Sequence, residues 1–478
     1  MQSSRYGQAV TPATASWLAV LLLVFSVLGG GGRGGLGDMA AQLLALALLL
    51  YLAWLLANRG ISWRAPTWVR WLPALALVLP AIQLLPIPAG LWASSPARAE
   101  LAAQLAQAGV VPAHVIGLSP IATEQALWAL LPATALFLCT LGLSRRSQLM
   151  LLVVIVILAT LSIFMGIAQL ADGNESPLRL YSPTNRDQAV GFYANRNHFA
   201  GFLAMILPLV FAATSWSVVE RLGGRRMSPF VVIACCALVI LLMLGIALSR
   251  SRAGMLLGML AVLGSLPLAM SLRKQRGMKR ILAAILAVAA MVSIQFSLLG
   301  VLQRLEVDPL SDGRWKYATV TLQAASAYAP LGSGLGTFQQ AYQPFEAKSA
   351  PGRYVINHAH DDYLELWLEG GVPALALMLL GAAAWLWRGR QLLDRREHAG
   401  SGEASGVFLA RAAWLAASVG LLHSALDYPL RTTASMAVFS VLVAIAFSET
   451  SRATGSALRV LDTRSESSKV RSRMQVVN

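Results

Sequence analysis

Histidine and aspartate stand together in the segment 357–374, which reads NHAHDDYLELWLEGGVPA. His360 comes directly before an apolar stretch, so we expect it at the N-terminus of a helix. The helix dipole there favours the neutral imidazole, which is the form able to accept a proton. Asp361 or Asp362 suits the N-cap of the same helix, and either carboxylate could orient the His360 ring or shift its pKa the other way. The pattern therefore predicts a general base at His360.

The same segment allows a metal site as an alternative. From His358 onward the residues read H-x-H-D-D, and H-x-H occurs in zinc sites. A third nitrogen or sulfur ligand does not stand at a useful spacing, although Asp361 or Asp362 would suit Mg²⁺. We expect a site that works without a metal or another cofactor.

A second group of candidates consists of arginines between apolar stretches. Arg250 and Arg252 lie in ALSRSRAG, a connection of a few residues that places both guanidinium groups at a membrane boundary. A charge there is costly unless an anion meets it, and the planar guanidinium suits phosphate oxygens. Contact with lipid headgroups is the simpler alternative. Arg314, in SDGRWKYA, and Arg196 fall on the same side, and several arginines on one face favour a lipid-linked phosphate or diphosphate.

Two further segments contribute polar residues at the ends of apolar runs. In GFYANRNHFAG, Arg196 and Asn197 could line a polar pocket for sugar or phosphate, whereas His198 is expected to be an interfacial histidine bonded to a neighbour. In HSALDYPLR, Asp427 and Arg431 stand at the last turn of the chain between apolar runs. A structural salt bridge is the favoured interpretation of that pair.

Glycines mark two irregular places near the main candidate. Gly370 and Gly371, followed by Pro373, should interrupt the start of the helix after His360. The segment 330–338, PLGSGLGTF, contains G-x-G-x-G but lacks the strand–helix context of a nucleotide-binding loop. We expect it to be a flexible connection or a lid beside a substrate.

The composition requires lipid around the elements that position these residues. Of 478 residues, 56% are hydrophobic and only 13% are charged, and the mean hydropathy is +0.62. A soluble protein cannot hide so much apolar surface, so the chain is expected to be an all-α polytopic membrane protein. The net charge of +16 fits basic loops on the cytoplasmic side and does not indicate nucleic acid.

The chain contains about twelve apolar runs of spanning length. They lie near 16–31, 38–57, 68–86, 123–143, 148–170, 197–217, 229–249, 253–271, 280–300, 364–387, 407–425 and 432–448. Short basic connections follow every second run, which predicts that these connections and both termini face the cytoplasm. The long connections 87–122, 171–196 and 301–363 then lie on the opposite side of the membrane, and 96–108 is expected to form a short amphipathic helix.

This interpretation divides the chain into five parts. They are residues 1–122 with three spans and the first outer loop, 123–300 with spans four to nine, the large outer loop 301–363 between spans nine and ten, 364–448 with the last three spans, and a basic tail, 449–478. The tail is polar and Ser-rich, as is typical of disordered segments.

Together and in this order, the segments resemble the O-antigen ligase and O-antigen polymerase superfamily of bacterial inner-membrane glycosyltransferases. The resemblance covers roughly residues 120–450 and rests on GFYANRNHFAGFL, SRSRAG, GRWKYA, PLGSGLGTF, HAHDDYLELWLEGGVPA and HSALDYPLR. The ligase pattern of a histidine, usually an asparagine, and then a glycine of the next helix falls on His360, Asp361 and Gly371. Asp361 departs from the usual amide residue.

The resemblance implies a metal-independent, inverting, GT-C-like enzyme whose active site faces the periplasm. Its donor would be a glycan on undecaprenyl diphosphate, and its acceptor lipid A–core or a second lipid-linked glycan. Arg252 and Arg314 match the arginines that hold the diphosphate, with Arg250 or Arg196 as helpers. His360 matches the histidine that activates the acceptor hydroxyl.

Several functions fit these features, and an O-antigen ligase is the first choice. A polymerase that joins lipid-linked repeat units is the second, and transfer of glycan to protein is a third variant. A transporter or flippase of lipid-linked glycans belongs to a different class. The scarcity of charges at span centres and the lack of repeat symmetry argue against transport.

Overall fold

The structure of the protein is a computed structural model that describes residues 13–32, 35–182, 186–219, 229–270, 313–346, 355–394 and 401–448. The predicted span 280–300 and the tail 449–478 lie outside these residues, as do parts of the large outer loop.

The described residues form helices and contain no strand, which confirms the all-α class. The first half of the chain contains α1 (Ala13–Gly29), α2 (Leu36–Asn58), α3 (Thr67–Arg70), α4 (Leu72–Gln83), α5 (Ala89–Trp92), α6 (Pro96–Gln107), α7 (Pro120–Ala129), α8 (Leu131–Gly142), α9 (Arg145–Ala171) and α10 (Arg196–Val219). The second half contains α11 (Pro229–Leu248), α12 (Arg252–Met270), α14 (Gly313–Tyr328), α15 (Phe338–Tyr342), η3 (Gln343–Phe345), α16 (Asp362–Asp394), α17 (Ser401–Ser424), η4 (Pro429–Arg431) and α18 (Thr433–Phe447).

Six helical segments of the described chain are long and apolar enough to cross a bilayer. They are Leu36–Asn58, Pro120–Gly142, Arg145–Ala171, Arg196–Ala213, Asp362–Asp394 and Gly406–Ser424. Four shorter apolar helices accompany them: Ala13–Gly29, Ile233–Leu248, Arg252–Leu266 and Thr433–Phe447. The chain is thus a multi-pass membrane protein, and the count of about twelve spans stays a prediction.

One predicted span is shorter than expected. The apolar run 68–86 is divided into α3 and α4, and the 12 residues of α4 extend over about 18 Å. Pro73 explains the break between α3 and α4, because it lacks the N–H that would bond the carbonyl of Val69 one turn earlier, whereas α4 continues past Pro80 to Gln83.

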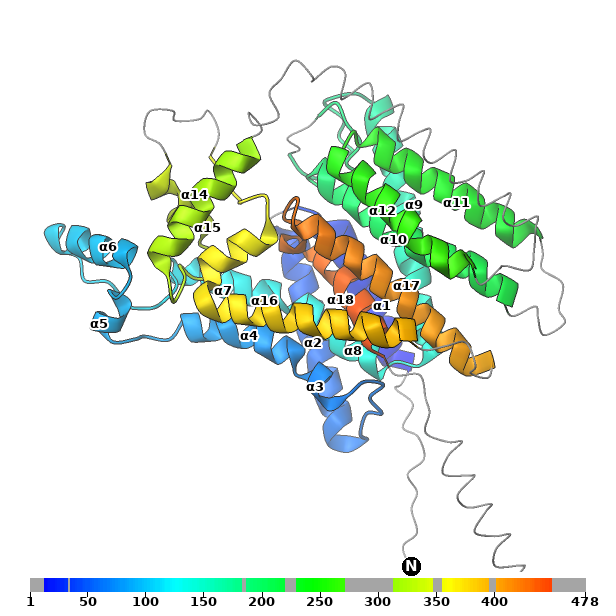
Figure 1. Cartoon of the computed structure of the whole chain (residues 1–478), viewed down its shortest axis with the longest axis horizontal. Helices are drawn as coiled ribbons and strands as arrows, with labels where there is room; N and C mark the ends of the chain where they lie inside the picture. Colours follow the sequence, from blue (N-terminus) through cyan, green and yellow to red (C-terminus); the bar gives the residue numbers. More distant parts are fainter. Residues whose placement is uncertain are drawn as a thin grey trace, which may run out of the picture.

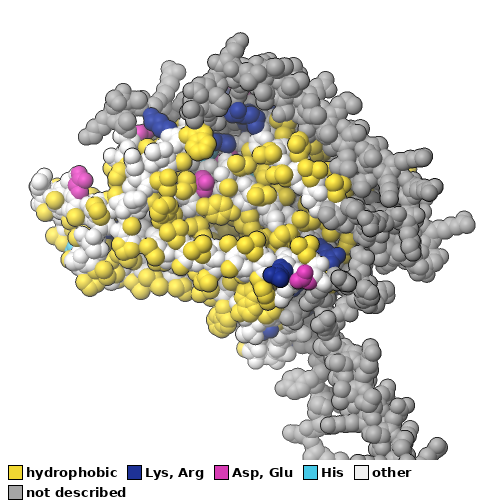
Figure 2. Space-filling model, in the orientation of Figure 1, with side chains coloured by type: hydrophobic (Ala, Val, Ile, Leu, Met, Phe, Trp, Pro, Cys, Tyr) yellow, Lys and Arg dark blue, Asp and Glu magenta, His cyan; other side chains and the backbone are white. Residues whose placement is uncertain are grey.

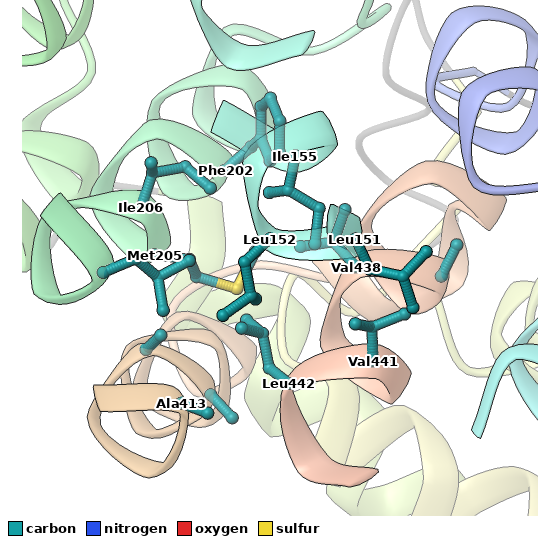
Figure 3. Packing of buried hydrophobic residues seen from close by; sticks show 14 of the residues in the cluster. Leu151, Leu152, Ile155, Phe202, Met205, Ile206, Ala413, Val438, Val441 and Leu442 are labelled. Atoms are coloured by element: carbon teal, nitrogen blue, oxygen red, sulfur yellow. The ribbon is translucent and has the colours of Figure 1, made fainter. Parts of the chain in front are cut away.

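Most of the described helices pack around one large apolar core, and a second, smaller cluster lies between α14, α15 and the start of α16. Helix α10 lies against α9, α11, α12 and α17, while α18 lies against α1, α8 and α17. Figure 3 shows Leu152 of α9, Met205 of α10 and Leu442 of α18 meeting in this core. Near-complete burial of α10 and α18 makes them the central helices of the bundle.

The opposite property marks the outside of the bundle. Large apolar side chains such as Trp54, Leu379 and Leu386 are exposed, and hydrophobic side chains cover most of the described surface in Figure 2. This surface suits contact with lipid.

Segments from the predicted outer loops gather at one end of the helices. In Figure 1, α5 and α6 lie beside α14 and α15 at one side of the molecule, and α11 and α12 lie at the other. The predicted amphipathic helix 96–108 is α6, but its Arg98 is fully buried and donates to the carbonyl of Gly332 at 2.8 Å. Helix α6 therefore docks on the segment 330–338 by hydrogen bonding.

Candidate active site

The candidate site forms where several helix ends meet. Helices α10, α12, α16 and α18 begin here, and α11 and α17 end here. Backbone bonds tie the connections together: Ala194 N donates to Gly31 O at 3.1 Å, and Ala189 N donates to Leu248 O at 3.3 Å. Residues far apart in sequence are thereby held within one polar network.

His360 and Asp427 are the centre of this network. The Nδ1 atom of His360 lies 3.0 Å from Oδ1 of Asp427, which is fully buried, whereas 30% of the His360 side chain is exposed. His360 has a left-handed backbone with φ of 55°, an uncommon conformation for a residue other than glycine. Such local strain occurs often at functional sites.

Asp427 accepts hydrogen bonds from several directions. Asn197 Nδ2 donates to its Oδ2 at 2.6 Å, and the backbone N–H of Tyr428 donates to its Oδ1 at 3.0 Å. A guanidinium nitrogen of Arg314 lies 3.8 Å from Oδ2. The carboxylate is thus satisfied on both oxygens.

These contacts decide the charge of Asp427 and the tautomer of His360. Burial on its own would raise the pKa of Asp427, but interactions with His198 and His360 outweigh burial and hold this pKa well below the usual range. An ionised carboxylate only accepts hydrogen bonds, so His360 must carry its proton on Nδ1. In the neutral ring Nε2 then has the free lone pair and can accept a proton.

A chain of hydrogen bonds links the pair to the SRSRAG segment. The Oγ of Ser251 accepts from Gly254 N at 3.0 Å and donates to Asn197 Oδ1 at 2.8 Å. Asn197 in turn donates to Asp427. The start of α12 is therefore fixed relative to His360.

The four predicted arginines differ in their surroundings. Arg314, at the start of α14, approaches Asp427, and Arg252 is the exposed first residue of α12, directly after Ser251. Exposed Arg250 lies 3.5 Å from Asp187, and Arg196 donates to Gln188.

The acidic residues after His360 have structural contacts. Asp361 is the N-cap of α16, because its Oδ1 accepts from Tyr363 N at 2.9 Å and from Leu364 N at 3.0 Å. Asp362 accepts from Ser424 Oγ at 2.8 Å. The carboxylate that binds the His360 ring is Asp427 instead of either neighbour.

A second charged cluster surrounds Arg431, next to the His360–Asp427 pair. Two of its members, Glu365 and Glu369, were not predicted from the sequence. Arg431 Nη1 lies 2.6 Å from Glu369 and 3.6 Å from Glu365, and its Nε lies 3.6 Å from Asp362. His358 Nδ1 lies 2.8 Å from Glu365. Arg431 therefore pairs with α16, while Asp427 pairs with His360; the salt bridge expected between them is replaced by these contacts.

The sequence did carry a signal for Glu365 and Glu369. Together with Asp362 they are spaced three and four residues apart, so they share one face of α16. Carboxylates on one face of an apolar helix indicate a buried partner, which here is Arg431.

Aromatic rings complete the wall around the histidines. Tyr428 stacks on His358 with ring centroids 3.9 Å apart, and it meets His198 and His360 edge-on at 4.8 Å and 5.1 Å. Tyr317 of α14 lies parallel to His360 at 6.0 Å. His198 is buried next to Asp427, with Nε2 at 3.9 Å from Oδ1.

The break in α16 is where the glycine-rich segment attaches. Gly371 has a non-helical backbone, which confirms the predicted interruption. The freed carbonyls of Leu368 and Glu369 accept from Ser333 N at 3.0 Å and Gly334 N at 2.8 Å. The segment 330–338, expected from sequence to be a flexible connection or a lid, is thus largely buried and hydrogen-bonded to α16 in this structure.

Within the described residues, no three His, Cys, Asp or Glu side chains are grouped so that they could hold a metal ion. His358 and His360 have separate carboxylate partners, Glu365 and Asp427. Each histidine of the H-x-H-D-D segment is thus hydrogen-bonded to a carboxylate outside that segment.

Comparison with known proteins agrees with the resemblance seen in sequence. Residues 236–379 match the family described as O-antigen ligase, and this supports the O-antigen ligase and polymerase superfamily. The matched range contains Arg252, Arg314 and His360, whereas Asn197 and Asp427 lie outside it. No curated protein matches the chain.

Proposed function

Because residues 236–379 match the O-antigen ligase family, we propose that this chain is a member of the O-antigen ligase and polymerase superfamily and a periplasmic-side glycosyltransferase of the bacterial inner membrane. It moves a glycan from undecaprenyl diphosphate to a sugar hydroxyl of lipid A–core. The observation that carries this proposal is the hydrogen bond between Nδ1 of the partly exposed His360 and the buried carboxylate of Asp427.

The chemistry is a single displacement at the anomeric carbon of the donor. The acceptor hydroxyl oxygen forms the new bond to that carbon while the bond to the diphosphate oxygen breaks on the opposite face, so the configuration inverts. The hydroxyl proton passes to Nε2 of His360, and Asp427 stabilises the resulting imidazolium.

Arginine side chains meet the charge that develops on the leaving group. Arg252 and Arg314 are assigned to the departing diphosphate, with Arg250 or Arg196 as helpers. A guanidinium binds phosphate oxygens with two parallel hydrogen bonds, and fixed charges at the site of charge development lower the barrier. A diphosphate is already a good leaving group, so positioning and charge stabilisation supply the catalysis without a metal.

A polymerase is the second candidate, favoured by Asp361 at the position where ligases usually have an amide. In that case the acceptor is another lipid-linked repeat unit, and the donor site is the same. A transfer to protein, or transport of the lipid-linked glycan, would leave both acceptors unmodified.

The test is glycan transfer by the purified protein in detergent with EDTA present. Carrier-diphosphate glycan is offered with either lipid A–core or a second repeat unit, so product on lipid A–core indicates a ligase and a longer carrier-linked glycan indicates a polymerase. We expect His360→Ala to abolish transfer, and Asp427→Asn to lower kcat about 100-fold or more because the amide cannot stabilise the imidazolium.

His114 offers a matched control for His360. It is a partly buried histidine that also has a left-handed backbone, with φ of 51°, but it lies in the connection before α7. His114→Ala should retain transfer. Transfer by His360→Ala at the wild-type rate would remove the general base from the proposal.

A further inference from the structure

The left-handed backbone of His360 needs an explanation within the structure, because few residues other than glycine adopt it. Asp427 binds only the ring of His360 and does not restrain its backbone. The restraint must come from contacts of the residues next to it.

Glu365 supplies that restraint with both carboxylate oxygens. Its Oε1 lies 2.8 Å from Nδ1 of His358, and its Oε2 accepts the backbone N–H of Ala359 at 2.9 Å. These are the two residues directly before His360. Since Glu365 is fully buried on the first turns of α16, it fixes the chain one residue before the strained position.

Glu365 is itself held by the segment that carries Asp427. Arg431 Nη1 lies 3.6 Å from Glu365 Oε1, and Tyr428 stacks on His358 with centroids 3.9 Å apart. The short stretch 427–431 therefore contacts both the ring of His360 and the residues that set its backbone. Any shift of Glu365 would move His360 relative to Asp427.

From these contacts we propose that Glu365 is a positioning residue for His360. Its carboxylate holds His358 and the N–H of Ala359, and so keeps His360 in the left-handed conformation that places Nδ1 on Asp427. This inference rests on the proposed function, in which Nε2 of His360 takes the acceptor proton.

The alternative is that Glu365 only neutralises Arg431 and stabilises the fold. The two roles differ in their kinetics. A misplaced base lowers kcat while donor and acceptor still bind, whereas a loss of fold lowers the amount of active enzyme and the unfolding temperature. Arg431 also lies 2.6 Å from Glu369 and 3.6 Å from Asp362, so we expect the guanidinium to stay paired when Glu365 is replaced.

The experiment compares Glu365→Ala, Glu365→Gln and Glu369→Gln in the detergent transfer assay, with kcat, both KM values and the unfolding temperature measured for each. We expect Glu365→Ala to lower kcat about 100-fold with both KM values unchanged, since displacement of about 1 Å has that effect on catalysis. Glu365→Gln should stay within about tenfold of wild type, because its amide can still accept from Ala359 and bind His358.

Glu369→Gln is the matched control. Glu369 is equally buried on the same helix and nearer to Arg431, but its carboxylate accepts from the N–H of Phe338 and from Arg431, whereas the N–H of Ala359 is bound by Glu365. It should lower the unfolding temperature and leave kcat near wild type. Equal losses of kcat in Glu369→Gln and Glu365→Ala, or no loss in Glu365→Ala, would overturn the positioning role.

A second variant decides the matter if Glu365→Ala does not fold. His358→Phe keeps a ring on Tyr428 but removes the bond to Glu365, and a kcat at the wild-type level would contradict the inference. Failure of the proposed function looks different: neither the wild type nor any variant at residue 365 would transfer glycan to either acceptor.

Discussion

At the scale of single residues, the two histidines of the H-x-H-D-D segment bind different carboxylates, and neither carboxylate is the aspartate that follows His360. Asp427 binds the ring of His360, Glu365 binds His358, and Asp361 caps α16. Sequence reasoning had found His360 and its general environment, because a histidine before an apolar run is a local pattern. It could not find Asp427 as the partner, since the two residues are 67 positions apart and only the fold brings them together.

The capping role of Asp361 leads to a prediction with a defined pH dependence. Burial raises the pKa of Asp361, so its ionised form destabilises the folded protein. The cost is present above the raised pKa and disappears as pH falls below the ordinary carboxyl value. Asn accepts the same two N–H groups as an N-cap. Asp361→Asn should therefore be at least as stable as wild type at neutral pH, and this advantage should vanish once the pH is below 3.8, the ordinary pKa of an aspartate side chain.

Thermal unfolding in detergent at both pH values measures this difference. Asp361→Ala is the control without a cap, and it should be less stable than wild type by about 1 kcal/mol. A variant Asp361→Asn that is as unstable as Asp361→Ala would show that the charge itself holds the helix terminus.

At the scale of elements, the break in α16 joins the helix to the rest of the site. A Cβ added at Gly371 would lie 2.2 Å from the carbonyl oxygen of Pro330, and φ is +58°. Gly371→Ala should thus lower stability by about 1–3 kcal/mol through overpacking and backbone strain. The measurements are the apparent unfolding temperature and kcat. We expect kcat to fall as well, because His360 lies two residues before the first residue of α16.

Gly381 provides the comparison on the same helix. A Cβ added there meets nothing within 4 Å and φ is ordinary, so Gly381→Ala should leave stability unchanged or raise it. If both substitutions had the same effect, the close approach of the 330–338 segment to α16 would not be what requires glycine at 371.

At the scale of the whole molecule, periodicity and composition were enough to predict an all-helical membrane protein and most helix positions. The division of the run 68–86 into α3 and α4 was not expected, because apolar content does not show that Pro73 interrupts the backbone hydrogen bonds of the helix. The segment 330–338 was expected to be a flexible connection or a lid, and its bonding to α16 could not be predicted, because the carbonyls of Leu368 and Glu369 become available only when α16 is broken. Long-range pairing of this kind has no local sequence signal.

The predicted orientation of the molecule can be tested with residues at its two ends. Glu175 lies in the 171–196 connection near the site and is 81% exposed, and Arg390 lies near the far end of α16 and is 86% exposed. If the basic connections face the cytoplasm, a membrane-impermeant thiol reagent on spheroplasts should label Glu175→Cys. Arg390→Cys should react only after the membrane is opened.

The three native cysteines are first replaced by serine or alanine, since Cys235 and Cys236 are partly exposed. The similar exposure of the two test positions means that a difference in labelling reports the side of the membrane and not burial. Labelling of Arg390→Cys alone in spheroplasts would invert the topology. It would place His360 and its arginines on the cytoplasmic side, where a glycan presented in the periplasm does not reach them.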